Sequence, residues 1–182
     1  MIKTDPQSGI IYRSWQPPQA QAVLLLVHGL GAHSGRWEAL AKYFSNHNFS
    51  SYGLELRGFG STNFLKGHVE SFNIYFQDIL SLRGIIEREK QKKKVFLIGE
   101  SFGGMLSFLL AQKQGQAFSG LVLIAPAFSI KMQVSLWDYL QVALHLFINP
   151  KKQFKVRLSA AMCTRDTAYQ QQLDSDPLES RD

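Results

Sequence analysis

Short apolar segments alternate with longer amphipathic segments along much of this 182-residue chain, and this alternation limits the folds open to it. The clearest apolar segment covers residues 22–27 (AVLLLV), where neither face of a strand would carry a polar side chain. A continuous apolar strand is typical of a parallel sheet that is covered on both faces. Residues 51–56, 95–98 and 121–124 are predicted to form further strands of the same sheet.

Helices are predicted between these strands. Apolar residues recur at helical spacing over residues 36–46 and 72–90, and a segment rich in Leu and Ala covers residues 103–114. Gly115 follows this last segment and is suited to a left-handed C-cap. Because parallel neighbouring strands need crossover connections, the pattern predicts a mostly parallel, doubly wound α/β sheet. Residues 10–15 are predicted to add an antiparallel edge strand.

The composition indicates one globular domain and argues against a nucleic-acid partner. Apolar residues make up 45% of the chain, which is enough for a sizeable core. Much of the net charge of +6 comes from lysines at 90–94 and 151–152. Lysines that end a helix complement its dipole, so we expect no nucleic-acid partner, with attraction to an anionic surface as the alternative. The single cysteine, Cys163, and the lack of a signal-peptide pattern favour a cytoplasmic protein.

Residues 99–103 (GESFG) fit the pattern G-x-S-x-G and lie directly between a predicted strand and a predicted helix. In an α/β-hydrolase fold this turn is the nucleophile elbow, which projects a serine hydroxyl above the edge of the sheet. We therefore predict that Ser101 is a catalytic nucleophile and that Gly99, Gly103 and Gly104 allow close backbone approach around it. The alternative is that these glycines only pack a helix against a strand.

A serine nucleophile needs a histidine base, a carboxylate that orients the base, and backbone donors for the oxyanion. We expect the donors to be the amide of Phe102 and the amide of Leu30, which lies in the glycine-rich turn after the first apolar strand. An ordinary turn is the alternative interpretation of that segment. The residues expected to support this oxyanion loop are His28, Gly29 and Gly31, with His28 as a structural residue, braced by His33, Ser34 and Arg36.

Four motifs recur together in one group of proteins: residues 28–37 (HGLGAHSGRW), 56–61 (LRGFGS), 67–72 (GHVESF) and 175–178 (SDPL). They resemble motifs of the monoacylglycerol lipase and lysophospholipase group of α/β hydrolases, which is often described as serine aminopeptidase S33-like. Phe59 stands where that group usually has histidine, and Glu55 stands near a position often filled by aspartate. The resemblance implies hydrolysis of carboxylic esters of single-chain lipids through an acyl-enzyme on Ser101, with no metal and no organic cofactor.

Other functions are compatible with the same fold. A peptidase or a small-ester hydrolase is one alternative, because a fold does not fix its substrate. A noncatalytic remnant that binds an apolar ligand is another. The sequence predicts nothing about the oligomeric state.

The resemblance also divides the chain into three regions. Residues 1–126 are expected to be the N-terminal part of the hydrolase core, 127–172 a cap insertion, and 173–182 the start of the return to the core. In this fold the triad acid and histidine follow the serine on loops after later strands. Since His145, inside the expected cap, is the one histidine after Ser101, we expect neither triad partner in this chain. We therefore expect an N-terminal fragment that lacks the last core strands, has an exposed sheet edge and is itself inactive.

The expected cap contains an apolar stripe at helical spacing, followed by basic residues. The stripe is predicted to face the acyl chain of a substrate, with packing against the core as the alternative. The apolar segment is too short to span a bilayer, and peripheral contact with a membrane surface is a further hypothesis. The stripe consists of Leu136, Trp137, Leu140, Leu144 and Phe147.

Overall fold

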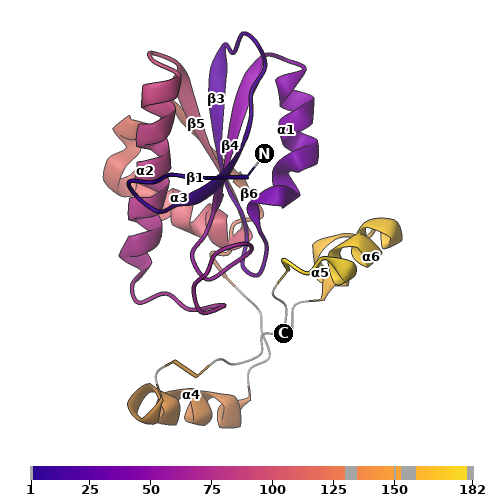
Figure 1. Ribbon diagram of the computed structural model, residues 1–182. Coiled ribbons are helices and arrows are strands. Elements are labelled where there is room, and N and C mark those ends of the chain that lie inside the picture. Colours follow the sequence, from indigo (N-terminus) through magenta and orange to yellow (C-terminus); the bar gives the residue numbers. More distant parts are fainter. Residues whose placement is uncertain (1, 130–134, 150, 153–158, 180–182) are drawn as a thin grey trace. The chain divides into compact units, whose positions relative to one another are not determined.

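The computed structural model describes residues 2–129, 135–149, 151–152 and 159–179, which belong to two compact units. Unit 1 consists of Met1–Ala127 together with Pro177–Ser180. Unit 2 consists of Phe128–Asp176 with Arg181–Asp182. Figure 1 shows the helices and strands of each unit.

Unit 1 is built on a six-stranded sheet with the spatial order β1-β2-β4-β3-β5-β6. β3 pairs in parallel with β4 and β5, and β5 pairs in parallel with β6, whereas β1 and β2 are antiparallel. The predicted fold class, an α/β fold with a mostly parallel sheet, is confirmed. The strand expected at residues 10–15 is antiparallel as predicted, but the prediction that it lies at the edge is wrong, because β1 pairs with its outer side. The strands are β1 (Ile2–Thr4), β2 (Ile11–Trp15), β3 (Ala22–Val27), β4 (Phe49–Glu55), β5 (Lys94–Glu100) and β6 (Gly120–Ile124).

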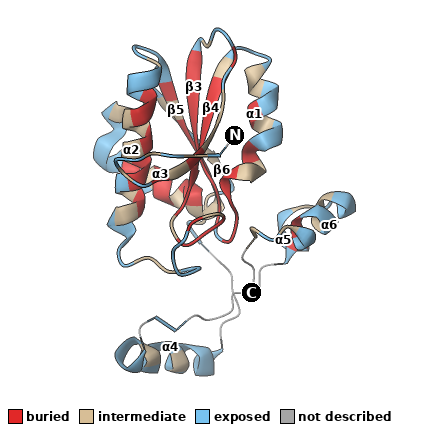
Figure 2. Cartoon of the chain, viewed as in Figure 1, coloured by how far each residue is buried: buried red, intermediate tan, exposed pale blue. Residues whose placement is uncertain are grey.

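Helices cover both faces of this sheet (Figure 1). All six residues of β3 are buried, and successive side chains of a strand point to opposite faces. Val23, Leu25 and Val27 pack in the core that includes α2 (Phe72–Glu89) and α3 (Ser101–Gln114). Leu24 and Leu26 pack with Trp37 and Ala41, from the short 3-10 helix η1 (Ser34–Trp37) and from α1 (Glu38–Ser45). Figure 2 shows the buried residues concentrated in β3, β4 and β5 and on the inner sides of the helices.

The end of α3 differs from the expectation. Gly115 has φ −57° and ψ −29°, so the prediction of a left-handed C-cap is wrong. The chain instead continues into the 3-10 helix η2 (Gly115–Ala117), and the amide of Phe118 donates to the carbonyl oxygen of Gly115. A tighter 3-10 turn is a common ending for an α-helix, and it requires no positive φ.

β6 lies at an edge of the sheet and has one neighbouring strand, β5, among the described residues. Val122 pairs with Ile98, so its side chain points to the sheet face that also carries α1. Val122 and Ile124 are 46% and 39% exposed. The edge of the sheet therefore presents apolar side chains that are only partly covered.

The described residues of unit 2 form three helices. Ser135 and Asp138 form a capping box at the start of the first, in which each side chain accepts a hydrogen bond from the other residue's backbone amide. Within the described ranges, no helix is both long enough and apolar enough to span a membrane. The helices are α4 (Leu136–Ile148), α5 (Ala160–Cys163) and α6 (Thr167–Ser175).

A substitution at Gly103 tests the close packing of α3 against β3. A Cβ atom at Gly103 would lie 2.4 Å from the carbonyl oxygens of Val27 and His28. Because backbone atoms cannot swing aside, we expect Gly103→Ala to lower the free energy of unfolding by about 3 kcal/mol, the upper end of typical overpacking costs. Urea denaturation measures this loss.

Gly115→Ala is the matched control, because a Cβ atom there meets nothing within 4 Å and the backbone is right-handed. Its free energy of unfolding is expected to stay unchanged or to rise by up to about 1 kcal/mol. Equal losses in the two variants would contradict the close approach at Gly103.

Candidate active site

Ser101 is the first residue of α3 and has a positive φ of 52°. Few residues other than glycine adopt this left-handed conformation, which costs roughly 1–3 kcal/mol. The surrounding structure must therefore hold the turn between β5 and α3 in place. One such contact is the amide of Ala127, which donates to the carbonyl oxygen of Ser101 at 3.0 Å.

Glycines lie at the close backbone contacts around Ser101. A Cβ atom at Gly99 would come within 2.4 Å of the carbonyl oxygen of Gly103, and one at Gly104 within 3.0 Å of the carbonyl oxygen of Gly99. A Cβ atom at Gly29 would lie 3.2 Å from the Cβ of Ser101. The structure thus brings the turn after β3 directly against the predicted nucleophile.

The loop after β3 is held by His28, which is fully buried. Its Nδ1 lies 2.8 Å from the carbonyl oxygen of Gly29, and its Nε2 accepts a hydrogen bond from the amide of Leu56 at 3.1 Å. These two contacts require the proton on Nδ1 and use both ring nitrogens. Burial lowers the pKa of His28 to about 4, so the ring is neutral near pH 7. This geometry is that of a structural residue and leaves no nitrogen to act as a base.

A second buried group, Glu55 at the end of β4, joins two loops. Its carboxylate accepts hydrogen bonds at 2.7 Å from the amide of Ser34 and at 2.7 Å from the amide of Ser61. Burial alone would raise the pKa of Glu55, but hydrogen bonds from the Ser34 side chain and from the amides of Ser61 and Ser34 outweigh it and hold the pKa below its usual range. The sequence shows Glu55 only as a departure from the family pattern, although a carboxylate at the end of a buried strand is itself a signal.

Arg36 connects the same loop to two further carboxylates. Its Nε lies 3.6 Å from Oε1 of Glu179, and its Nη2 lies 3.9 Å from Oε1 of Glu100, the residue before Ser101. Nε2 of His33 lies 4.0 Å from the same oxygen of Glu179, while its Nδ1 accepts from the amide of Gly35. Sequence reasoning missed Glu179, whose side chain is 3% exposed. The nearby motif at 175–178 is the one local signal.

The two residues expected to supply the oxyanion donors, Phe102 and Leu30, differ in how tightly their surroundings hold them. The ring of Phe102 packs edge-to-face against Tyr75 of α2 at 5.7 Å and lies 6.1 Å from the ring of Phe72. Leu30 is 38% exposed and precedes Gly31, which has a φ of 74°. Phe102 is therefore held by aromatic packing, whereas Leu30 lies in a glycine-rich turn at the surface.

A family model described as serine aminopeptidase, S33, matches residues 18–182. The chain belongs to this family. Its α/β-hydrolase fold also matches the crystal structure of a monoacylglycerol lipase from Paleococcus ferrophilus, with a TM-score of 0.80 and 24% identity. That match covers 94% of this chain and 64% of the other.

Curated relatives of the chain include proteins named as a lipase and as a phospholipase. Monoglyceride lipase from Mus musculus is 28% identical over 183 residues, which covers 100% of this chain and 60% of the relative. A phospholipase from Bacillus subtilis is 25% identical over 155 residues, which covers 84% of this chain and 59% of the relative. The chain therefore spans about 60% of the length of these relatives.

No described residue forms a hydrogen bond with the Ser101 hydroxyl, and all five histidines of the S33 chain are among the described residues. His28 and His33 hold the loop after β3, and Nε2 of His68 is buried without a hydrogen-bond partner among the described residues. Nδ1 of His47 contacts the carbonyl oxygen of Tyr43, and His145 belongs to unit 2. In the described ranges there is also no group of three His, Cys, Asp or Glu side chains that could hold a metal ion.

The predicted acyl-binding residues all lie on α4 in unit 2. Each is between 54% and 90% exposed, so none packs into a core among the described residues of unit 2 itself. Their role as a substrate-facing stripe stays a prediction. They are Leu136, Trp137, Leu140, Leu144 and Phe147.

The buried, neutral His28 predicts a pH dependence of stability. An unfolded histidine takes up a proton near its ordinary pKa of 6.5, whereas folded His28 takes one up only near pH 4. The contribution of His28 to the free energy of unfolding is therefore complete above about pH 6.5. It falls as the pH drops toward 4, and the loss from this group is about 3 kcal/mol.

Urea denaturation at several pH values between 4 and 7 measures this loss. His28→Gln is expected to be less stable at pH 7 but to lose less stability on acidification than the wild type, because the titrating ring is gone. Parallel pH profiles for the two proteins would show that His28 is not held neutral.

Proposed function

We propose that Ser101 is the nucleophile of a carboxylic ester hydrolase that acts on single-chain lipids, such as monoacylglycerols or lysophospholipids. The observation that carries this proposal is the left-handed conformation of Ser101 at the start of α3, with Gly29 of the neighbouring loop against it. Strained residues cluster at functional sites. The relatives named monoglyceride lipase and phospholipase support a lipid ester as substrate.

In the proposed reaction, Oγ of Ser101 attacks the ester carbonyl carbon and forms a tetrahedral intermediate. The amides of Leu30 and Phe102 donate to the oxyanion, and the positive end of the α3 dipole lies at the same place. Collapse of the intermediate breaks the bond to the alcohol and leaves an acyl-enzyme. Attack by water on this acyl-enzyme then releases the fatty acid and restores Ser101.

The attack also needs a base that takes the serine proton and delivers it to the leaving alcohol. Both nitrogens of His28 are used in the core, and no other described histidine bonds Ser101. We therefore expect the 182-residue chain alone to retain only oxyanion stabilisation, which in serine hydrolases leaves a small residual rate. The exposed apolar residues of α4 are proposed to bind the acyl chain and to make peripheral contact with lipid surfaces.

Fluorophosphonate probes test the proposal because they trap a nucleophilic serine covalently. A probe with a long alkyl chain is expected to label Ser101 slowly but in preference to all other serines, as mapped by mass spectrometry, and Ser101→Ala is expected to abolish the labelling. A probe with an ethyl group and one with an aminoacyl group, matched in leaving group, are expected to react more slowly.

Other outcomes separate the alternatives. Faster reaction with the aminoacyl probe would favour a peptidase. Equal reaction with all three probes would contradict the proposed selectivity for lipids. Failure of every probe to prefer Ser101, with lipid binding retained, would indicate a noncatalytic lipid-binding protein.

A further inference from the structure

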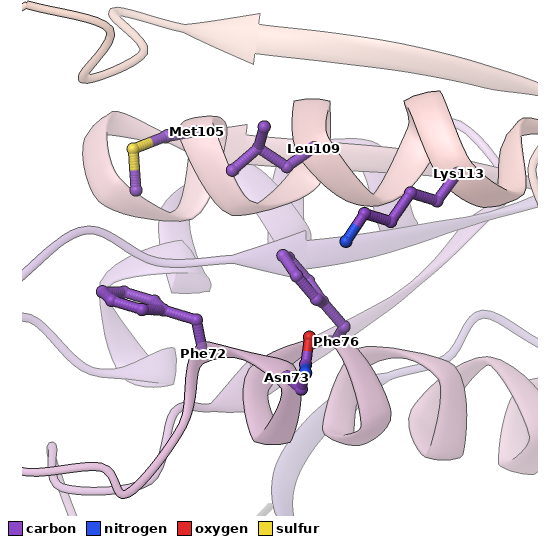
Figure 3. Close-up of a pocket in the computed structure, with 6 residues that line it drawn as sticks. All are labelled: Phe72, Asn73, Phe76, Met105, Leu109 and Lys113. Carbon is purple, nitrogen blue, oxygen red and sulfur yellow. The ribbon is translucent and has the colours of Figure 1, made fainter.

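A groove of about 370 Å³ runs between α2 and α3, outside the residues assigned to ester hydrolysis. Figure 3 shows Phe72 and Phe76 of α2 facing Met105 and Leu109 of α3, with Lys113 beyond them. Its volume is within the range of small-molecule sites. Asn73 is the one uncharged polar residue that lines it.

The shape of the groove suits a single alkyl chain. Met105, Leu109 and Lys113 follow each other at intervals of four residues and so form one row along α3, about 12 Å long at 1.5 Å per residue. Phe72 and Phe76 form the opposite row.

The charge of the groove lies at one end. Nζ of Lys113 is 5.2 Å from the centre of the Phe76 ring, which draws the ammonium group toward the apolar walls. Among the described residues, no carboxylate lies within ion-pairing distance of Lys113. The groove is apolar and has the Lys113 ammonium group at one end. It is therefore complementary to an alkyl chain with an anionic head group.

We propose that this groove binds a fatty acid anion, with the carboxylate at Lys113 and the alkyl chain along Leu109, Met105 and the two phenylalanines. The apolar end of the groove reaches Phe72, whose ring is 6.1 Å from that of Phe102, the residue after Ser101. The ligand would therefore contact the helix that carries the predicted nucleophile. Fatty acids are also the product class of the proposed hydrolysis, but the binding does not depend on turnover.

Calorimetric titration of the full chain tests the proposal with three probes of equal length: decanoate, decanol and decyltrimethylammonium, each below its micelle-forming concentration. Decanoate is expected to bind most tightly and decyltrimethylammonium most weakly. Lys113→Gln is expected to weaken decanoate about three- to fivefold, the range of an exposed ion pair, and to leave decanol unchanged. Lys113→Arg is expected to keep the preference for decanoate.

Lys93→Gln is the matched control, because it removes the same charge from an exposed residue that does not line the groove. Leu109→Gln is expected to weaken decanoate and decanol alike, since it replaces an apolar wall by a polar side chain of good helix propensity. Ser101→Ala is expected to bind decanoate like the wild type, which separates this site from the proposed catalysis.

A fatty acid that carries a photoreactive diazirine locates the site directly. Crosslinks are expected in peptides that contain residues 72–76 and 105–113. Crosslinks confined to α4, equal affinities for decanoate and decanol, or equal effects of Lys113→Gln and Lys93→Gln would each overturn the proposal.

Discussion

The turn from β5 into α3 is the constraint on which the rest of unit 1 depends. Ser101 has a φ of 52°, and a Cβ atom at Gly99 or Gly103 would strike backbone atoms 2.4 Å away. β3 and β5 are parallel neighbours, and Val27 pairs with Gly99, so the loop after β3 and the turn after β5 begin side by side. This adjacency follows from sheet topology, and it places the turn where open α/β sheets bind ligands, at the carboxyl ends of their strands.

Buried polar groups keep the loops around that turn in one arrangement. Glu55 binds the amides of Ser34 and Ser61, and His28 bonds both Gly29 and Leu56. Removing one member of such a pair leaves a buried group unsatisfied, which costs about 1–3 kcal/mol for a neutral group and more for a charged one. These buried hydrogen bonds hold the loops beside the strained serine, and a preorganised oxyanion site would require such support.

The central fold could be predicted because its signals are local. The apolar run of β3 and the glycines at 99 and 103 can be recognised from the residues next to them in the sequence. The strand, the elbow and the helix after it could therefore be predicted together. β1 spans only Ile2–Thr4 and is too short to show a strand pattern.

The contacts of Glu55 and Glu179 join segments that are far apart in the sequence, so the local signals near these two residues do not identify their partners. The conformation of Gly115 was predicted wrongly because a glycine permits a left-handed backbone without requiring one. Sequence patterns therefore identified the elements that carry the candidate site, whereas the side-chain network that braces it needed three-dimensional coordinates.

The central claim, that the fold holds Ser101 in a left-handed conformation, is tested most directly by comparing the unfolding free energies of Ser101→Gly and Ser101→Ala. At an ordinary helical position alanine is more stable than glycine by about 1 kcal/mol. A left-handed backbone costs an L-residue roughly 1–2 kcal/mol and costs glycine almost nothing. The account predicts that Ser101→Gly is the more stable variant, by about 1 kcal/mol. The ordinary order, with Ser101→Ala more stable, would contradict it.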